Sequence, residues 1–198
     1  MKKAFLILLL SSISAIAFGR AKTHSVLYKK LSAMYKEDQK WRIESAKLYN
    51  HQKSDYDRET VDKNWAAADS LNEAEAKRII ARYGYPGYSL VGESGSSRFW
   101  AIVQHCDDDI AFQQKVLVLM KKEVDRNNAS GENYAYLTDR VLTNLNQKQL
   151  YGTQGINNPK TKKWEPLPIK DAAHVEARRK AMGMMTLKQY IAETNAAN

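Results

Sequence analysis

Residues 104–109, with the sequence QHCDDD, carry the side chains of this chain best suited to chemistry. They follow directly on the apolar run of residues 99–103, so we expect a core-forming helix to end in a cluster of imidazole, thiol and carboxylate groups. One histidine beside three aspartates fits an acid/base site, a weak metal site or a hydrogen-bonded helix terminus. The residue types alone leave these three alternatives open.

In the acid/base interpretation, His105 transfers protons and a carboxylate fixes its tautomer and raises its basicity. Asp107, Asp38 and Asp139 are the candidate carboxylates, and we expect catalytic roles for all four residues. Such a pair is what a hydrolase needs to activate water. The structural alternative is a buried histidine that a local carboxylate satisfies.

Further polar side chains are candidates for substrate binding. Arg42 or Arg140 is expected to hold an anionic group, and Gln104, Tyr151 and Gln154 to orient the substrate by hydrogen bonds. Polar groups beside core positions need mutual partners, and gathering them around one pocket supplies these. The sequence therefore predicts one cleft lined by six side chains: Asp38, Arg42, His105, Asp107, Tyr151 and Gln154.

Two of these residues also have purely structural interpretations. Asp38 lies on the apolar stripe of its helix, one turn before Arg42, and i,i+4 spacing allows the two to pair. Asp139 is followed by Arg140 on a helix that already has apolar anchors, so this pair either serves the site or forms a buried ion pair.

Metal, cofactor and thiol chemistry have weaker support. His105, Asp107 and Asp109 are two residues apart, a spacing that would place their side chains on one side of an extended loop, as metal ligands. However, zinc sites usually use more His or Cys ligands, and a calcium loop would add a glycine and a terminal glutamate. We therefore expect no metal and no cofactor. Cys106 is the only cysteine, which excludes an internal disulfide, and its acidic neighbours disfavour a thiolate.

The N-terminus has the features of an export signal. Lys2 and Lys3 precede an apolar stretch, and Ala15 and Ala17 offer the small residues that a signal peptidase requires. We expect residues 1–17 to be removed and residues 18–198 to form a single domain in the periplasm or outside the cell. The alternative, an uncleaved anchor, is disfavoured because the stretch is shorter than the ~20 residues that span a bilayer.

The chain has a formal net charge of +9, and its C-terminal part contributes strongly. Residues 160–188 contain eight Lys and Arg residues and only three acids. Such a segment is either a solvated face or a surface for an anionic envelope polymer or phospholipid headgroups. Nucleic acid is not favoured, because no aromatic residues alternate with the cations. We expect a monomer whose partner is a small molecule or an anionic envelope polymer, with no transmembrane span in the mature chain.

Hydrophobic periodicity and capping residues predict a mainly helical domain with a small β-hairpin near its C-terminal third. The hairpin is expected to pair residues 149–154 with residues 163–167. The predicted helices cover residues 26–50, 59–68, 72–84, 110–124, a segment capped by Ser130, residues 171–183, and a last one capped by Thr186.

Several polar motifs occur together along the chain, in this order: Asp38-Gln39 with Arg42, Tyr83 to Pro86 followed by Gly92, Gln104-His105-x-Asp107, Tyr134 to Leu137, Asp139-Arg140, Tyr151 to Gln154, and Arg178-Arg179 before Gly183. In combination they resemble an uncharacterised bacterial family known only as a domain of unknown function (DUF6624). The resemblance covers about residues 27–190. It implies a mostly helical fold and recurring polar motifs, and it implies no established reaction.

Overall fold

A computed structural model describes the backbone of residues 5–197 and the side chains of residues 25–197. It is mainly helical with one antiparallel hairpin, which confirms the predicted fold class. The elements are α1 (Phe5–Tyr49), α2 (Arg58–Tyr83), α3 (Tyr88–Val103), α4 (Ile110–Val124), α5 (Gly131–Asn144), β1 (Gly155–Asn158), β2 (Lys163–Pro166), η1 (Ala172–His174), α6 (Val175–Ala181) and α7 (Leu187–Ala197).

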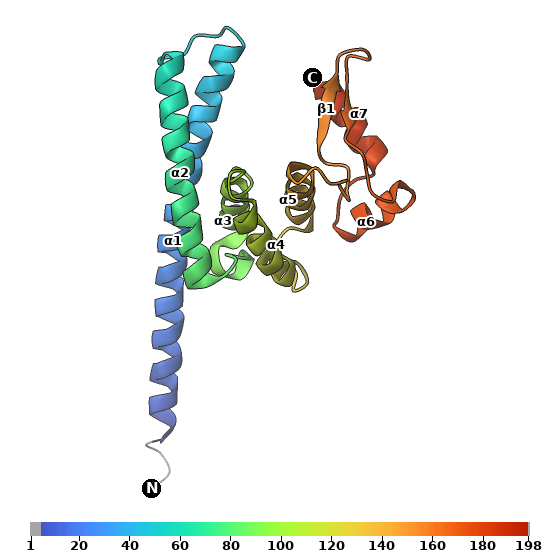
Figure 1. Ribbon diagram of the computed structural model, residues 1–198. Coiled ribbons are helices and arrows are strands. Elements are labelled where there is room, and N and C mark those ends of the chain that lie inside the picture. Colours follow the sequence, from blue (N-terminus) through green and yellow to red (C-terminus); the bar gives the residue numbers. More distant parts are fainter. Residues whose placement is uncertain (1–4, 198) are drawn as a thin grey trace.

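Helices α1, α2 and α3 pack against one another, and α4 packs against α5 (Figure 1). The largest cluster of buried apolar side chains joins these five helices, and Leu31, Phe99 and Met120 are inaccessible to solvent within it. The expected apolar stripe of α1 supplies Leu27 and Leu31 to this core and Trp41 to a smaller cluster against α2. Burial of such side chains supplies most of the driving force for helix packing.

Helix α2 is one continuous helix, although the sequence predicts two. Asp57 caps its start by accepting a hydrogen bond from the backbone N–H of Thr60 at 2.7 Å. Asn72, where the sequence predicts a new helix to begin, lies buried inside α2, and its side chain donates to the Met34 carbonyl of α1 at 3.3 Å. The prediction of a break at Asn72 is therefore wrong, because the polar side chain binds the neighbouring helix and not its own backbone.

Two glycines determine the backbone conformation of α3 and its packing against α1. Gly92 has φ of +71°, a left-handed conformation that disrupts the helix near its start and favours glycine. At Gly95, an added Cβ would lie 3.2 Å from the ring of Tyr28 in α1 and 2.7 Å from Cβ of Val91. The absence of a side chain thus allows α1 and α3 to approach closely. Helix α3 ends at Val103, two residues before His105.

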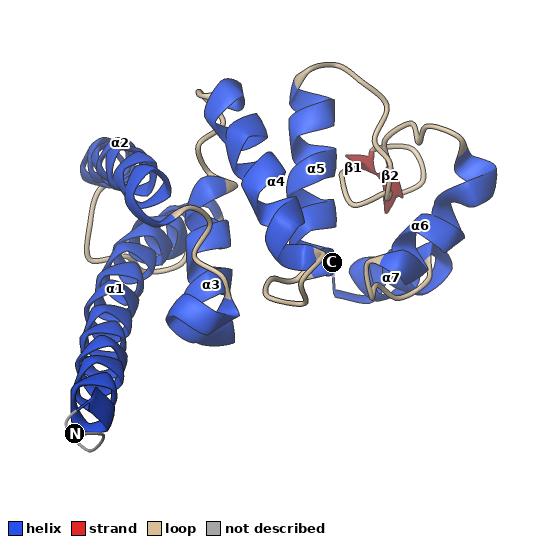
Figure 2. Cartoon of the chain, turned by 90° about the horizontal axis from the view of Figure 1, so that it is seen from below, coloured by secondary structure: helices blue, strands red, loops and turns tan. Residues whose placement is uncertain are grey.

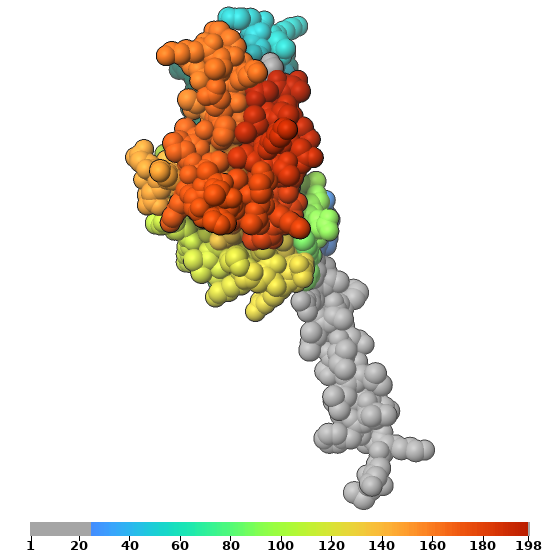
Figure 3. Space-filling view, turned by 90° about the vertical axis from the view of Figure 1, so that its right-hand side faces the viewer, coloured from blue at the N-terminus to red at the C-terminus, as the bar shows by residue number. Residues whose placement is uncertain are grey.

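The C-terminal part differs in detail from the prediction. The hairpin pairs residues 155–158 with residues 163–166, whereas residues 149–154 form a loop with one isolated bridge from Gln149 to Ile169. The expected helix over residues 171–183 is a 3₁₀ turn followed by α6. Figures 2 and 3 show these elements grouped on the side of α5 that faces away from α1. The predicted caps Ser130 and Thr186 are present at α5 and α7.

The predicted signal peptide, residues 1–17, lies outside the residues whose side chains are described. In the part of the chain that the structure describes, no helix is both long and apolar enough to cross a membrane.

Candidate functional site

His105 is joined to Asp38 across the interface between α3 and α1. Nδ1 of the imidazole lies 2.8 Å from Oδ1 of Asp38. The carboxylate is almost inaccessible, with 1% of its side chain exposed, whereas 16% of the His105 side chain is exposed. The same Asp38 carboxylate accepts hydrogen bonds from the side chains of Gln39 and Arg42. The pairing of Asp38 with Arg42 confirms the i,i+4 prediction.

The protonation state of Asp38 decides which nitrogen of His105 carries the proton. Burial by itself would raise the pKa of Asp38, but the hydrogen bonds and positive charges of His105 and Arg42 outweigh burial and lower the pKa. The carboxylate is therefore ionised at neutral pH and can only accept hydrogen bonds. Nδ1 must donate to it, so Nε2 of a neutral His105 is the acceptor nitrogen. No other described side chain is hydrogen-bonded to the His105 ring.

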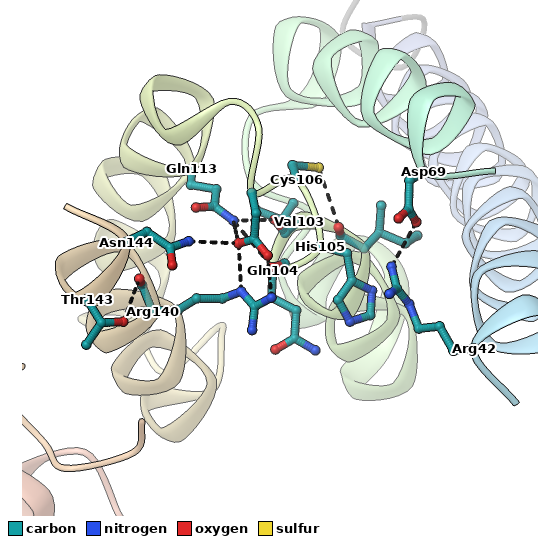
Figure 4. Close-up of polar contacts among 12 residues, drawn as sticks. Arg42, Asp69, Val103, Gln104, His105, Cys106, Gln113, Arg140, Thr143 and Asn144 are labelled. Carbon is teal, nitrogen blue, oxygen red and sulfur yellow. Dashed lines mark hydrogen bonds and ion pairs between the residues drawn. The ribbon is translucent and has the colours of Figure 1, made fainter. Parts of the chain in front are cut away.

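Asp69 of α2 completes this group through Arg42. The Arg42 guanidinium binds Oδ1 of Asp69 at 2.8 Å (Figure 4) and Oδ1 of Asp38 at 3.1 Å, so it links the two carboxylates. The indole Nε1 of Trp65 donates to Oδ2 of Asp69 at 2.8 Å, and Arg42 also lies over the Trp65 ring. Burial raises the pKa of Asp69, and the nearby Arg42 opposes this only in part. The pKa values of Asp38 and Asp69 are thus shifted in opposite directions beside the same guanidinium.

A cleft of about 490 Å³ opens beside this group. Its lining is formed by α2 and the turn after α3, and consists of Asp62, Trp65, Ala66, Asp69, Ser70, Glu73, His105 and Asp108. Four of these residues carry carboxylates and none carries a guanidinium or an ammonium group. Glu73 is paired with Lys77, Asp69 with Arg42 and Asp62 with Arg58, which leaves Asp108 without an ion pair among the described residues. The cleft is therefore acidic, although the whole chain is basic.

Asp107 belongs to a second network, and its partners Gln113, Arg140 and Asn144 lie on the opposite side of Figure 4 from Arg42. Arg140 of α5 binds both of its carboxylate oxygens, with Nε 2.8 Å from Oδ1, and Asn144 donates to Oδ1 at 3.0 Å. Gln113 of α4 is inaccessible to solvent and donates to Asp107 and to the Val103 carbonyl. This network ties the end of α3 to α4 and α5.

Asp139 forms a third network and is completely buried. Its carboxylate accepts hydrogen bonds from the backbone N–H groups of Leu150, Tyr151 and Thr153, and from the Thr153 hydroxyl. The expected strand over residues 149–154 is therefore a loop wrapped around this carboxylate. Gln149 closes the loop by accepting from the Gln154 N–H and donating to the Gln154 carbonyl.

Two basic residues of the C-terminal segment, Arg178 and Arg179, also donate hydrogen bonds to the backbone of this loop. Arg179 is 1% exposed and donates to the Tyr151 carbonyl at 2.7 Å, while Arg178 donates to the Leu150 carbonyl at 2.8 Å. These two cations thus bind backbone oxygens, whereas the six lysines of residues 160–188 are exposed.

The contacts divide the predicted site residues among these three networks. Asp38, Arg42 and His105 come together as expected, and Asp107 meets Arg140 on the far side of the turn. Gln104 lies between the two groups, and its carbonyl accepts from Gln113 at 3.4 Å. Tyr151 and Gln154 contact the Asp139 network and do not line the cleft beside His105. Both predicted anion-binding arginines are already paired with carboxylates.

Sequence reasoning missed Asp69, Trp65 and Gln113. Trp65 and Asp69 are four residues apart, a spacing that places them on one face of α2 and could have indicated their hydrogen bond. Gln113 lies in an apolar helix, where a lone amide gives no signal of what it binds.

Other parts of the acidic segment have structural roles. Asp109 caps α4 by accepting from the Phe112 N–H at 2.9 Å, as the sequence indicated for at least one of these acids. Cys106 is 4% exposed, and burial raises the pKa of its thiol to about 12. Among the described residues, no group of three or more His, Cys, Asp or Glu side chains is arranged to hold a metal ion.

The chain belongs to a family of unknown function, DUF6624, whose model matches residues 26–198. No curated protein and no solved structure matches it.

Proposed function

We propose that the cleft beside His105 is a general acid/base site that promotes hydrolysis of a neutral or positively charged substrate. The observation that carries the proposal is the 2.8 Å contact between His105 Nδ1 and the buried Asp38 carboxylate. Such a contact holds the imidazole in one tautomer and stabilises the imidazolium that forms when the ring accepts a proton. Because His105 lines the cleft, its free nitrogen is available to a bound water.

In this mechanism, His105 Nε2 takes a proton from a water molecule whose oxygen attacks the substrate. The bond from the attacked atom to the leaving group breaks, and the His105 imidazolium gives the same proton to the leaving group. Ionised Asp38 stabilises the imidazolium while it carries the proton. His105 is then neutral again, and no further proton has to be supplied.

The charge of the cleft restricts the substrate. Carboxylates of Asp62, Glu73 and Asp108 line it, and a negatively charged substrate would be repelled by them. Arg42 does not offset this charge, since two carboxylates already bind it. A neutral polar group or an amine is therefore the favoured ligand. This replaces the anionic group that the sequence suggested for Arg42 and Arg140.

The proposal includes export to the periplasm or the exterior. Its support is the sequence of residues 1–17, with two lysines, an apolar stretch and the Ala15-x-Ala17 pattern. Mass spectrometry of the N-terminus tests it: a mature chain that begins near residue 18 supports export, and a cytoplasmic chain that retains Met1 contradicts it.

A second candidate function is non-catalytic binding of an anionic envelope polymer. It is favoured by the exposed lysines of residues 160–188, which lie on the C-terminal elements and not at the acidic cleft. Such binding would weaken with increasing salt and would not depend on His105.

An activity screen with a matched histidine control distinguishes the two functions. The protein is incubated with neutral and amine-bearing esters, amides and glycosides. His105→Ala and Asp38→Asn are expected to reduce turnover by about 10²- to 10⁴-fold. His174→Ala is the control, because His174 also contacts an aspartate, Asp171, but is 72% exposed and lies outside the cleft. Turnover that survives His105→Ala would contradict the proposed function.

A further inference from the structure

A second groove lies between α1 and α3, and hydrogen-bond donors line it where carboxylates line the acidic cleft. Its volume is about 340 Å³, and its lining is Tyr35, Ser94, Ser97, Arg98, Trp100 and Ala101. Five of these side chains carry a hydrogen-bond donor, and none carries a carboxylate. A ligand in this groove therefore meets hydroxyl and guanidinium groups.

Arg98 supplies a positive charge that no carboxylate neutralises among the described residues. Its guanidinium donates to the Ser32 hydroxyl and lies 5.0 Å from the centre of the Tyr28 ring. A hydroxyl and an aromatic ring hold the guanidinium in place but do not cancel its charge. Arg42 and Arg140 differ in this respect, because each is paired with carboxylates.

Trp100 adds a donor without a partner. Its indole Nε1 is buried and makes no hydrogen bond within the described part of the chain. In contrast, the indole nitrogens of Trp41 and Trp65 donate to Glu37 and Asp69. A buried donor left without an acceptor costs free energy. Because Trp100 also lines the groove, its indole N–H signal can report a ligand bound there.

The phenol of Tyr28 reports the same positive environment. Hydrogen bonds from Arg98 and Ser94, together with the Arg98 charge, lower the pKa of Tyr28. Arg98 thus stabilises negative charge on a nearby oxygen.

We propose that this groove binds the phosphate group of a ligand, with Arg98 as its main anchor and Ser94 and Ser97 as further donors. A phosphate has enough acceptor oxygens to use several donors at once, and arginine pairs with two of them in parallel. The inference is independent of the acid/base function, because none of these residues lines the His105 cleft.

The test is a titration of ¹⁵N-labelled protein with inorganic phosphate, followed by NMR at the four indole N–H signals. The Trp100 signal is expected to shift and saturate, and those of Trp41 and Trp65 to stay in place. Arg98→Gln should weaken binding by about tenfold or more. Arg126→Gln removes the same charge from a residue that is 70% exposed and paired with Glu123, and it should leave binding unchanged.

Two results would overturn the proposal: a Trp100 signal that does not move, or equal phosphate affinity in Arg98→Gln and the wild type. Thermal unfolding of Arg98→Gln is measured in parallel, and if that variant does not fold, Ser97→Ala takes its place. Sedimentation with phosphatidylglycerol vesicles then distinguishes the source of the phosphate. Arg98-dependent sedimentation identifies a lipid headgroup, and phosphate binding without sedimentation identifies a soluble phosphate compound.

Discussion

His105 and Asp38 are 67 residues apart in the sequence, yet His105 Nδ1 and Asp38 Oδ1 lie 2.8 Å apart in the structure. The contact follows from the packing of α1 against α3 and from the end of α3 at Val103, which places His105 in the following turn. The acid/base account depends on this contact.

Asp139→Asn is expected to lower the free energy of unfolding by about 3 kcal/mol or more, because it replaces a buried charged acceptor that binds three backbone N–H groups. Urea unfolding measures the effect. The control is Asp125→Asn, since Asp125 is 60% exposed and paired only with Lys121. Equal stability of the two variants would show that the loop of residues 149–154 does not depend on Asp139.

Asp107→Asn is expected to make stability less sensitive to acid. Burial by itself raises the pKa of Asp107, but Arg140 outweighs it and the pKa is lowered. The stabilisation from this carboxylate is therefore present above its unfolded pKa of about 3.9 and is lost as the pH falls through the lower folded pKa. Thermal unfolding between about pH 5 and about pH 2 checks the sign. A pH dependence as steep in the variant as in the wild type contradicts it.

Cys106 is expected to resist thiol reagents in the folded protein at about pH 8, where a thiol with a pKa of about 12 is almost entirely protonated. Reaction with an aromatic disulfide reagent should begin only when the chain unfolds in urea. Rapid labelling of the native protein would show that the end of α3 opens readily.

Gln113→Leu is expected to loosen the turn that carries His105, because it leaves the Val103 carbonyl without its side-chain donor in a buried place. The substitution should accelerate amide hydrogen exchange more at residues 103–109 than in α2. Unchanged protection of this turn would rule out a role for Gln113 in positioning His105.

Local features of the fold could be predicted from the sequence, and contacts between helices could not. The caps Ser130 and Asp109 and the pair of Asp38 with Arg42 depend on neighbours within four residues, so spacing indicates them. Asn72 and residues 149–154 were predicted wrongly for one common reason. Their hydrogen-bond partners, the Met34 carbonyl and the Asp139 carboxylate, lie on other elements.

The same limit applies to the candidate site. Asp38, Arg42 and His105 were named from the sequence because each is an unusual polar residue beside an apolar run. Asp69 was not, since only the packing of α2 against α1 brings it to Arg42. The backbone N–H of Tyr151 donates to Asp139, and Gln154 donates to Thr153 of the same network; their motif does not indicate these contacts.

The tautomer of His105 tests the central claim most directly, and a long-range ¹⁵N–¹H NMR spectrum of the imidazole measures it without a known substrate. Near neutral pH, the neutral ring is expected to carry its proton on Nδ1 and to have an unprotonated Nε2. Asp38→Asn should abolish this preference, while the exposed His174 ring serves as the internal reference. A proton on Nε2 in the wild type, or a spectrum that Asp38→Asn leaves unchanged, would contradict the acid/base account.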